Sequence, residues 1–151
     1  IFVHLFTPCQ VYSTVCCETV NITREVIYGD SDPPGPYNIA IRVGNTMYNS
    51  GRLGVVLEPL GIIPGGIIPE MRETFDGIME VLKAGRLNLN DVVKVIVYLT
   101  DWDDYDEMNE AYSKYFTGNY PARSVVQVKM LPEGARVFIE VTSVDSENET
   151  Q

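Results

Sequence analysis

The chain has 151 residues, of which 45% are apolar and 21% are charged. This length accommodates one domain with a substantial core, and the composition is that of a folded soluble domain, which excludes a disordered chain. The formal net charge of −10 repels a phosphate backbone, so we expect no nucleic-acid partner.

An apolar N-terminal extension at residues 1–19 precedes the expected single domain at residues 20–151. The extension lacks the features of a targeting peptide, and polar residues interrupt it too often for it to span a bilayer. It contains the three cysteines and His4. Because Cys16 and Cys17 are adjacent and no metal-ligand spacing is recognisable, we expect reduced thiols, no metal site, no membrane partner and a cytoplasmic protein.

The sequence of the first half of the domain predicts three short strands and two loops. Residues 23–29 form a strand candidate that ends at a glycine turn, and the proline-rich residues 31–37 predict a loop. Residues 38–51 contain two β runs that meet at Gly44-Asn45, which is a hairpin signal. Residues 54–69, rich in glycine and proline, predict a second loop that contains at most a short strand.

The second half predicts two amphipathic helices that alternate with strands. A helix is expected over residues 69–86, with Pro69 near its start and Gly85 at its end. A β-branched strand follows at residues 90–100 and a second helix at residues 101–116. The apolar stripes of the two helices are Met71, Phe75, Ile78, Met79 and Leu82, and Tyr105, Met108, Tyr112, Tyr115 and Phe116.

Six of the ten residues at 101–110 are acidic. Such a run is typical of the solvated face and first turn of a helix. Either Thr100 or Asp101 is expected to cap that helix.

The last two predicted strands flank a turn at residues 132–134. In the final strand, Val137, Ile139 and Val141 alternate with Phe138 and Glu140, so that one face belongs to the core. The element order predicts an α+β fold, a mixed sheet with both helices on one of its faces. The opposite face needs a cover, and self-association is the simplest one.

The domain contains no cysteine and no histidine, which excludes Cys-His and Ser-His machinery. Its glycine-rich segments lack the Lys-Ser/Thr pair of a phosphate loop. Chemistry therefore rests on arginine, carboxylates, hydroxyls and backbone groups. Arg123 taken alone is either a surface ion-pair former or a guanidinium that grips a carboxylate through two hydrogen bonds, whereas Tyr37 and Ser50 taken alone are structural.

Six motifs in order and spacing carry a family resemblance: "GPY", "VGNTMYNSG", "DVVKVIVYLTD", "MNEAYSKYF", "PARSVVQV" and "LPEGARVFIEV". Over residues 22–144 the chain resembles the reactive intermediate deaminase (Rid, YjgF-like) family. The resemblance implies a chorismate-mutase-like fold and a homotrimer with sites in clefts between subunits. It also implies hydrolysis of 2-imino and 2-enamino acids, such as 2-iminobutanoate and 2-aminoacrylate, to 2-oxo acids and ammonia without a cofactor.

The resemblance also assigns roles to six positions. It makes Arg123 the anchor of the substrate carboxylate and implies catalytic hydroxyls at Tyr37 and Ser50. The remaining substrate contacts that it implies are Gly51, Val125 and Phe138.

Three positions depart from the family pattern. Arg52 replaces the common glutamine, Val125 replaces a frequent cysteine, and Phe138 replaces the first of two alternating glutamates, to which water handling is attributed. Glu140 retains the second glutamate and points to the same face, but about 7 Å further along the strand. A base acts within about 3 Å of its proton or through one more water, so Glu140 is no direct replacement.

Two functions follow from this pattern. In the first, the protein is an imine deaminase in which hydroxyls, backbone carbonyls or Glu140 acting through water replace the lost acid. In the second, it is a non-catalytic trimer that binds small carboxylates, with Phe138 making the cleft drier. The ribonuclease activity attributed to some relatives is disfavoured by the charge of −10 and by the absence of histidine in the domain.

Overall fold

The computed structural model describes residues 22–29, 33, 35–57 and 60–146. The N-terminal extension, with its cysteines and His4, lies outside the described residues. Within the described part of the chain, no helix is long and apolar enough to cross a membrane.

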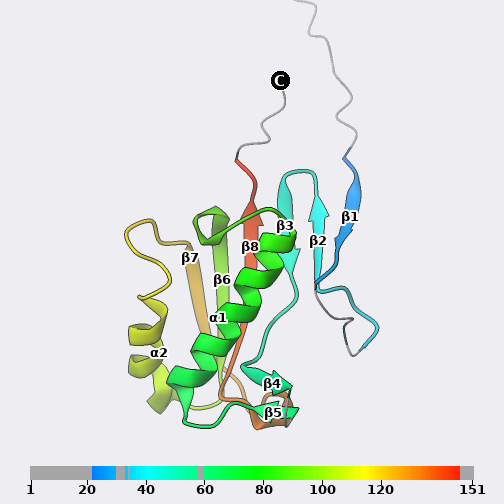
Figure 1. Cartoon of the computed structure of the whole chain (residues 1–151). Coiled ribbons are helices and arrows are strands. Elements are labelled where there is room, and N and C mark those ends of the chain that lie inside the picture. Colours follow the sequence, from blue (N-terminus) through cyan, green and yellow to red (C-terminus); the bar gives the residue numbers. More distant parts are fainter. Residues whose placement is uncertain (1–21, 30–32, 34, 58–59, 147–151) are drawn as a thin grey trace, which may run out of the picture.

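One mixed sheet of six strands forms the frame of the domain (Figure 1). Its strand order is β1-β2-β3-β8-β6-β7, and every neighbouring pair is antiparallel except β6 and β7, which are parallel. The predicted α+β fold with a mixed sheet is confirmed. The strands are β1 (Arg24–Ile27), β2 (Ala40–Val43), β3 (Thr46–Asn49), β6 (Val92–Leu99), β7 (Ala122–Gln127) and β8 (Val137–Val144).

The two strands around the 132–134 turn do not pair with each other. β6 lies between them, parallel to β7 and antiparallel to β8. A parallel pair needs a crossover, which the second helix supplies between β6 and β7. The hairpin predicted at Gly44-Asn45 is confirmed, since Val43 pairs with Thr46 across a two-residue turn.

Two helices cover one face of the sheet (Figure 1). Helix α1 runs from Ile67 to Ala84 and ends at Gly85, as predicted. The second helix is shorter than expected, because residues 102–104 form a 3-10 turn and α2 spans only Tyr105–Tyr112. The Asp101 side chain caps the 3-10 turn by accepting a hydrogen bond from the Asp103 backbone N–H at 3.0 Å.

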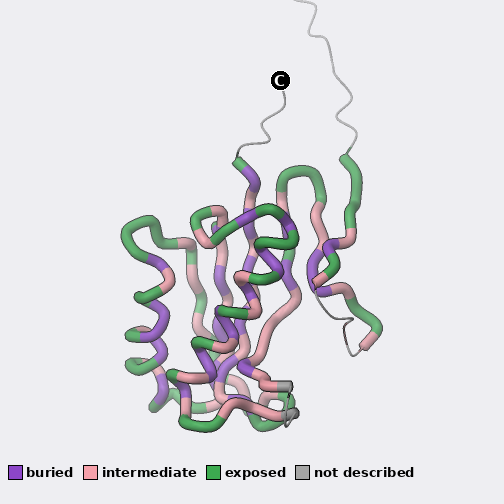
Figure 2. The backbone as a smooth tube through the Cα atoms, in the orientation of Figure 1, coloured by how far each residue is buried: buried purple, intermediate pink, exposed green. Residues whose placement is uncertain are grey.

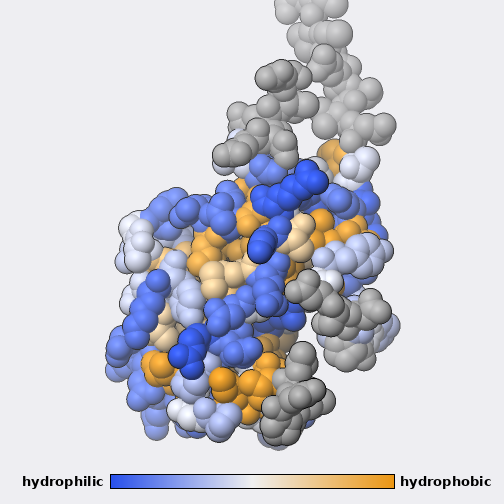
Figure 3. Space-filling model, in the orientation of Figure 1, coloured by the Kyte–Doolittle hydropathy of each residue, from blue (hydrophilic) through white to orange (hydrophobic). Residues whose placement is uncertain are grey.

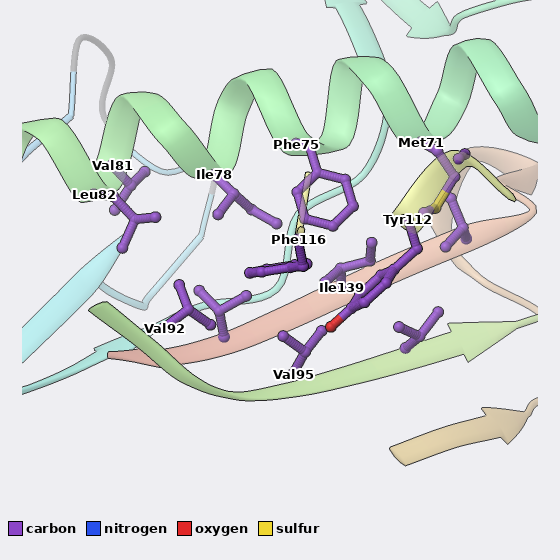
Figure 4. Packing of buried hydrophobic residues seen from close by; sticks show 14 of the residues in the cluster. Met71, Phe75, Ile78, Val81, Leu82, Val92, Val95, Tyr112, Phe116 and Ile139 are labelled. Carbon is purple, nitrogen blue, oxygen red and sulfur yellow. The ribbon is translucent and has the colours of Figure 1, made fainter. Parts of the chain in front are cut away.

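The core lies between the helices and the sheet (Figure 4). Phe75 of α1 stacks on Tyr115 with ring centroids 4.1 Å apart, and Tyr112 and Phe116 meet its edges. Tyr115 and Phe116 therefore keep their predicted place in the apolar stripe although they lie beyond the end of α2. Figure 2 shows the buried residues along the inner strands and the inner sides of both helices.

The helix-side surface is largely hydrophilic, with apolar atoms in several patches, one near the lower edge and others in the upper half of the view (Figure 3). The other face of the sheet, which we call the outer face, has no described element over it. Strand alternation places Phe138, Glu140 and Thr142 of β8 there, since Val137, Ile139 and Val141 are buried on the helix side.

The predicted glycine- and proline-rich loop contains a small hairpin of β4 (Val55–Leu57) and β5 (Leu60–Ile62). Gly54 precedes it, and a Cβ there would lie 2.5 Å from the backbone oxygen of Glu70. Since backbone cannot move aside locally, Gly54→Ala is expected to destabilise the domain by about 2 kcal/mol, measured by chemical unfolding. Gly61→Ala is the matched control, because no heavy atom lies within 4 Å of its added Cβ; an equal effect of both changes would contradict the packing account.

A buried polar cluster joins the start of α1 to the start of β8. Glu70 is 3% exposed and accepts a hydrogen bond of 2.8 Å from the Arg136 backbone N–H. The Arg136 guanidinium binds Asp104 through two hydrogen bonds of 2.6 and 2.8 Å. One residue of the acidic run is therefore a buried ion-pair partner, contrary to the expected solvated face.

The pKa of Glu70 is raised above its ordinary value of 4.5, because burial disfavours the charged carboxylate more than hydrogen bonds from the Arg136 and Val137 backbone favour it. A raised pKa contributes stability that is fully present below 4.5 and is lost as the pH rises through the folded-state value. Wild type is therefore expected to lose stability relative to Glu70→Gln as the pH rises from below 4.5. Urea unfolding of both proteins at several pH values measures the difference in their free energies of unfolding. A wild type that gains stability relative to Glu70→Gln as the pH rises would contradict the prediction.

Candidate functional site

Arg123 lies on the edge strand β7 and points to the helix side of the sheet. Its register partner on β6 is Val95, which is fully buried under the helices. Residues paired across a parallel ladder face the same side, so the Arg123 side chain leaves the strand toward α2. Val125, two residues further, faces the same side and packs against the core.

Three residues of α2 hold the Arg123 guanidinium. Nη2 donates to the Asn109 side-chain oxygen at 2.7 Å, Nη1 lies 4.0 Å from the Met108 sulfur, and Cζ lies 4.6 Å from the centroid of the Tyr112 ring. Among the described residues no carboxylate forms an ion pair with Arg123. The guanidinium is therefore fixed by neutral groups and keeps donors for an external anion.

A shallow pocket of about 340 Å³ opens beside this arginine. Its lining residues are Asn109, Tyr112, Ser113, Tyr120, Pro121 and Arg123. A volume of this size lies at the lower end of small-ligand pockets. The pocket therefore suits a compact carboxylate in reach of one strong cation.

Tyr112 supplies a neutral ring face under the guanidinium. Burial raises its pKa to about 12, and the nearby charge of Arg123 only partly opposes this shift. The phenol therefore stays protonated at neutral pH, and the attraction between the guanidinium and the ring is a cation–π contact.

Of the other predicted site residues, Gly51 and Phe138 meet on the outer face, and Ser50 directly precedes Gly51. The Phe138 ring lies directly over the backbone of Gly51, since a Cβ on that glycine would come within 1.9 Å of the ring. The Ser50 hydroxyl donates to the Asn38 carbonyl oxygen at 2.7 Å and so ties the end of β3 to the loop that carries Tyr37. The Tyr37 side chain is 49% exposed. Ser50 thus positions this loop and retains only acceptor capacity for a ligand.

Tyr98 and Glu140 lie beside Phe138 on the outer face. Tyr98 pairs in register with Phe138, and their ring centroids are 5.9 Å apart. Burial, the negative charge of Glu140 and a hydrogen bond with its carboxylate together raise the pKa of the Tyr98 phenol. The phenol is therefore protonated at neutral pH, next to the Glu140 carboxylate.

Arg52 does not join either group of residues. It forms an isolated antiparallel bridge with Ile139, which is a core position, and its guanidinium lies near Gly77 of α1. The departure from the family's glutamine therefore places no cation beside Phe138. Among the described residues no group of histidine, cysteine, aspartate and glutamate side chains is arranged to hold a metal ion.

The predicted site residues of one chain thus form two groups on opposite faces of the sheet. Arg123 and Val125 face the helix side at the β7 edge, and Gly51 and Phe138 meet on the outer face. β6 separates β7 from β8. The first group is called the anchor half below. The group of Gly51, Tyr98, Phe138 and Glu140 on the outer face, together with Ser50 and the loop that carries Tyr37, is called the outer half.

Comparison with known proteins identifies the family. The model of the Endoribonuclease L-PSP family matches residues 30–145. The chain belongs to this family, the Rid/YjgF/L-PSP family, so the resemblance seen in the motifs is confirmed. A mouse relative named 2-iminobutanoate/2-iminopropanoate deaminase is 40% identical over 126 residues, which are 82% of this chain and 93% of the relative.

Solved structures of relatives share the fold. RidA from the Antarctic bacterium Psychrobacter is 38% identical, with a TM-score of 0.71 over 76% of this chain and 92% of that one. Escherichia coli TdcF with bound serine is 28% identical, with a TM-score of 0.74 over 81% of this chain and 99% of that one.

Sequence reasoning missed the residues that support Arg123 and Phe138. Asn109 and Tyr112 stand three positions apart on α2, which puts them on one helix face, and the motif "MNEAYSKYF" contains both. Tyr98 carried no signal beyond its place in a strand. Its relation to Phe138 depends on the pairing of β6 with β8, which only the fold supplies.

Proposed function

We propose that the protein hydrolyses 2-imino and 2-enamino acids of the 2-iminobutanoate and 2-aminoacrylate type to 2-oxo acids and ammonia. The observation that carries this proposal is Arg123, a half-buried guanidinium held by Asn109 and Tyr112 on the wall of an open pocket without a described carboxylate partner. Such a group binds a 2-imino acid carboxylate through two hydrogen bonds and leaves C2 free. The relatives' names support the same reaction.

The complete site requires two copies of the chain in this proposal. The anchor half and the outer half lie on opposite faces of one sheet, and the apolar outer face has no described cover. A neighbouring copy that packs its β7 edge against this outer face covers it and brings the two halves together. We propose a homotrimer with a chorismate-mutase-like arrangement, in which each cleft uses both halves from different subunits.

The reaction needs positioning more than strong acids or bases. Water adds its oxygen to C2, and the proton that it gives up passes to a base and from the base to the imine nitrogen, which gives a carbinolamine. The base then takes the hydroxyl proton of the carbinolamine and gives it to the nitrogen, which leaves as ammonia while the C2–O bond becomes the carbonyl of the 2-oxo acid. The Arg123 charge withdraws electron density from C2 and fixes the carboxylate, and the hydroxyl of Tyr37 and the backbone near Gly51 orient the water.

Glu140 takes the water proton through one more water in this scheme, because it stands about 7 Å along the strand from Phe138. Phe138 leaves no acid at the position where the family resemblance places one, and Glu140 is the carboxylate nearest along the same face of β8. The Tyr98 phenol, whose pKa the Glu140 charge helps to raise, also borders the Phe138 ring, so this carboxylate belongs to the same part of the outer face. Glu140 passes the water proton to the imine nitrogen and later passes the carbinolamine hydroxyl proton to the leaving ammonia, so that the enzyme ends each cycle unchanged.

Glu140→Gln is therefore expected to lower kcat about a hundredfold while KM changes little, because a general base acts on the chemical step and not on carboxylate binding. Steady-state kinetics with 2-iminobutanoate measure both constants. Tyr98→Phe keeps the ring beside Phe138 but removes the hydroxyl, so a smaller loss in kcat is expected. An unchanged kcat in Glu140→Gln would show that Glu140 is not the general base.

The proposal is tested with a threonine dehydratase that generates 2-iminobutanoate, while release of the 2-oxo acid is followed. Wild type is expected to accelerate release above the rate in buffer, and Arg123→Ala is expected to reduce that acceleration about a hundredfold. Analytical light scattering in the same buffer is expected to give a trimer. A monomer would overturn the shared-cleft arrangement.

A second candidate function is a non-catalytic trimer that binds small carboxylates. Phe138 over Gly51 favours it, because this contact puts an apolar ring at the position of the family's acid. If wild type gives no acceleration while Phe138→Glu gains it, the protein is a carboxylate-binding member of the family.

A further inference from the structure

An uncharged row crosses the outer face at the level of Phe138. Register pairs Phe138 of β8 with Tyr98 of β6, and Tyr98 with Val126 of β7. Gly51 continues the row on the other side, under the Phe138 ring. The row therefore contains two aromatic rings, one exposed valine and bare backbone.

The charged residues of the outer face lie in the next rows along the strands. Glu140 pairs with Ile96, and Lys94 lies opposite Thr142 and donates to the Ser124 hydroxyl at 2.9 Å. A ligand group placed against Phe138 thus meets apolar surface first. Arg52, which follows Gly51, points to the helix side and adds no charge there. The guanidinium of Arg136, two residues before Phe138, is bound to Asp104.

The contact with Gly51 fixes the Phe138 ring at this place. The ring lies on the glycine backbone where any side chain would collide with it, and Tyr98 borders it at a tilt of 48°. Few rotamers are open to a ring so confined, hence it presents a stable face to the cleft. A polar ligand group against this face loses hydrogen bonds to water and gains none.

We infer that Phe138, with Tyr98, is a specificity-determining residue that makes the cleft select 2-imino acids with apolar side chains over those of equal size with polar or charged ones. This inference rests on the proposed function, because it takes the carboxylate of the ligand to be bound by Arg123. That anchor is common to all 2-imino acids and cannot discriminate among them. The side-chain contact at the Phe138 row supplies the discrimination.

Three ligands of nearly equal size test this selection. The 2-oxo acids derived from leucine, asparagine and aspartate are 4-methyl-2-oxopentanoate, 2-oxosuccinamate and 2-oxosuccinate; they share the carboxylate and differ in the polarity of the side chain. Calorimetric titration of the full chain with each is expected to give roughly tenfold or more tighter binding of the apolar ligand than of the amide. The same order is expected in kcat/KM for the corresponding imines, generated by an amino-acid oxidase.

Variants separate this role from a general effect on the fold. Phe138→Leu keeps an apolar contact and should preserve the order, whereas Phe138→Glu should reduce the preference for the apolar ligand to less than about twofold. Ile68→Ser is the matched control, because it removes an exposed apolar side chain from α1, on the helix side.

The outcomes distinguish this inference from the proposed function. Equal binding of the three ligands by wild type, or an unchanged preference in Phe138→Glu, overturns the selection while carboxylate binding through Arg123 stands. Failure to bind any of the ligands together with failure to hydrolyse any imine overturns the proposed function, and the selection with it.

Discussion

Arg123→Ala is expected to lower kcat/KM for 2-iminobutanoate by about two orders of magnitude, a loss as large as that expected for Glu140→Gln. The substitution removes both hydrogen bonds to the substrate carboxylate and the charge that makes C2 electrophilic. The loss should appear in binding as well, so titration with 2-oxobutanoate should give no measurable heat.

Arg123→Lys separates charge from geometry. Lysine keeps the positive charge but loses the planar fork that Asn109 and Tyr112 hold in place, so an intermediate activity is expected. Arg72→Ala is the matched control, since it removes an exposed arginine from α1 and should leave kcat/KM within about twofold. Thermal unfolding checks that all three variants fold. Full activity in Arg123→Ala would show that Arg123 does not bind the substrate carboxylate, and would overturn the proposed function.

The sequence predicted the fold well where periodicity and turn chemistry agree. The Gly44-Asn45 hairpin and the end of α1 at Gly85 follow from local signals that tertiary structure does not override. The pairing of β7 and β8 could not be predicted from the sequence. A turn at residues 132–134 is compatible with a hairpin of these two strands and also with β6 lying between them, which is what the structure has. Pairing over a long sequence separation has no local signal.

The site was predictable as a set of residues but not as an arrangement. Family motifs supplied Arg123, Gly51 and Phe138, and alternation along β8 placed Phe138 and Glu140 on one face. Arg123 faces the opposite side of the sheet, and this orientation follows from the register of β6 with β7, which the sequence does not show. The burial of Asp104 was missed for a similar reason, since its partner Arg136 lies 32 residues away in the chain.

The opposite orientation of the two half-sites leads to a prediction about mixed assemblies. Arg123→Ala inactivates the anchor half, and Glu140→Gln inactivates the outer half. If each cleft takes its halves from different chains, co-assembly of the two variants rebuilds some clefts with both halves intact. A trimer that contains both variants has three clefts. One of them joins the intact anchor half of a Glu140→Gln chain to the intact outer half of an Arg123→Ala chain, so about a third of the wild-type activity is expected of mixed trimers.

The experiment uses co-expression of the two variants with different affinity tags, followed by purification of assemblies that carry both tags. Each variant alone should retain about a hundredth of the wild-type activity, so a recovery to about a third is readily measured. A site contained within one chain predicts no recovery, since every chain then carries one defect in its own site. That result would overturn the shared cleft.

A second pair of variants controls for assembly itself. Asn109 and Arg123 both belong to the anchor half, since the Asn109 oxygen accepts from the guanidinium at 2.7 Å. Assemblies of Arg123→Ala with Asn109→Ala contain no cleft with an intact anchor half, whichever chains meet. Their activity should equal the average of the two parents. Recovery in the first pair without recovery in the second can arise only when Arg123 of one chain and Glu140 of another act on the same substrate molecule.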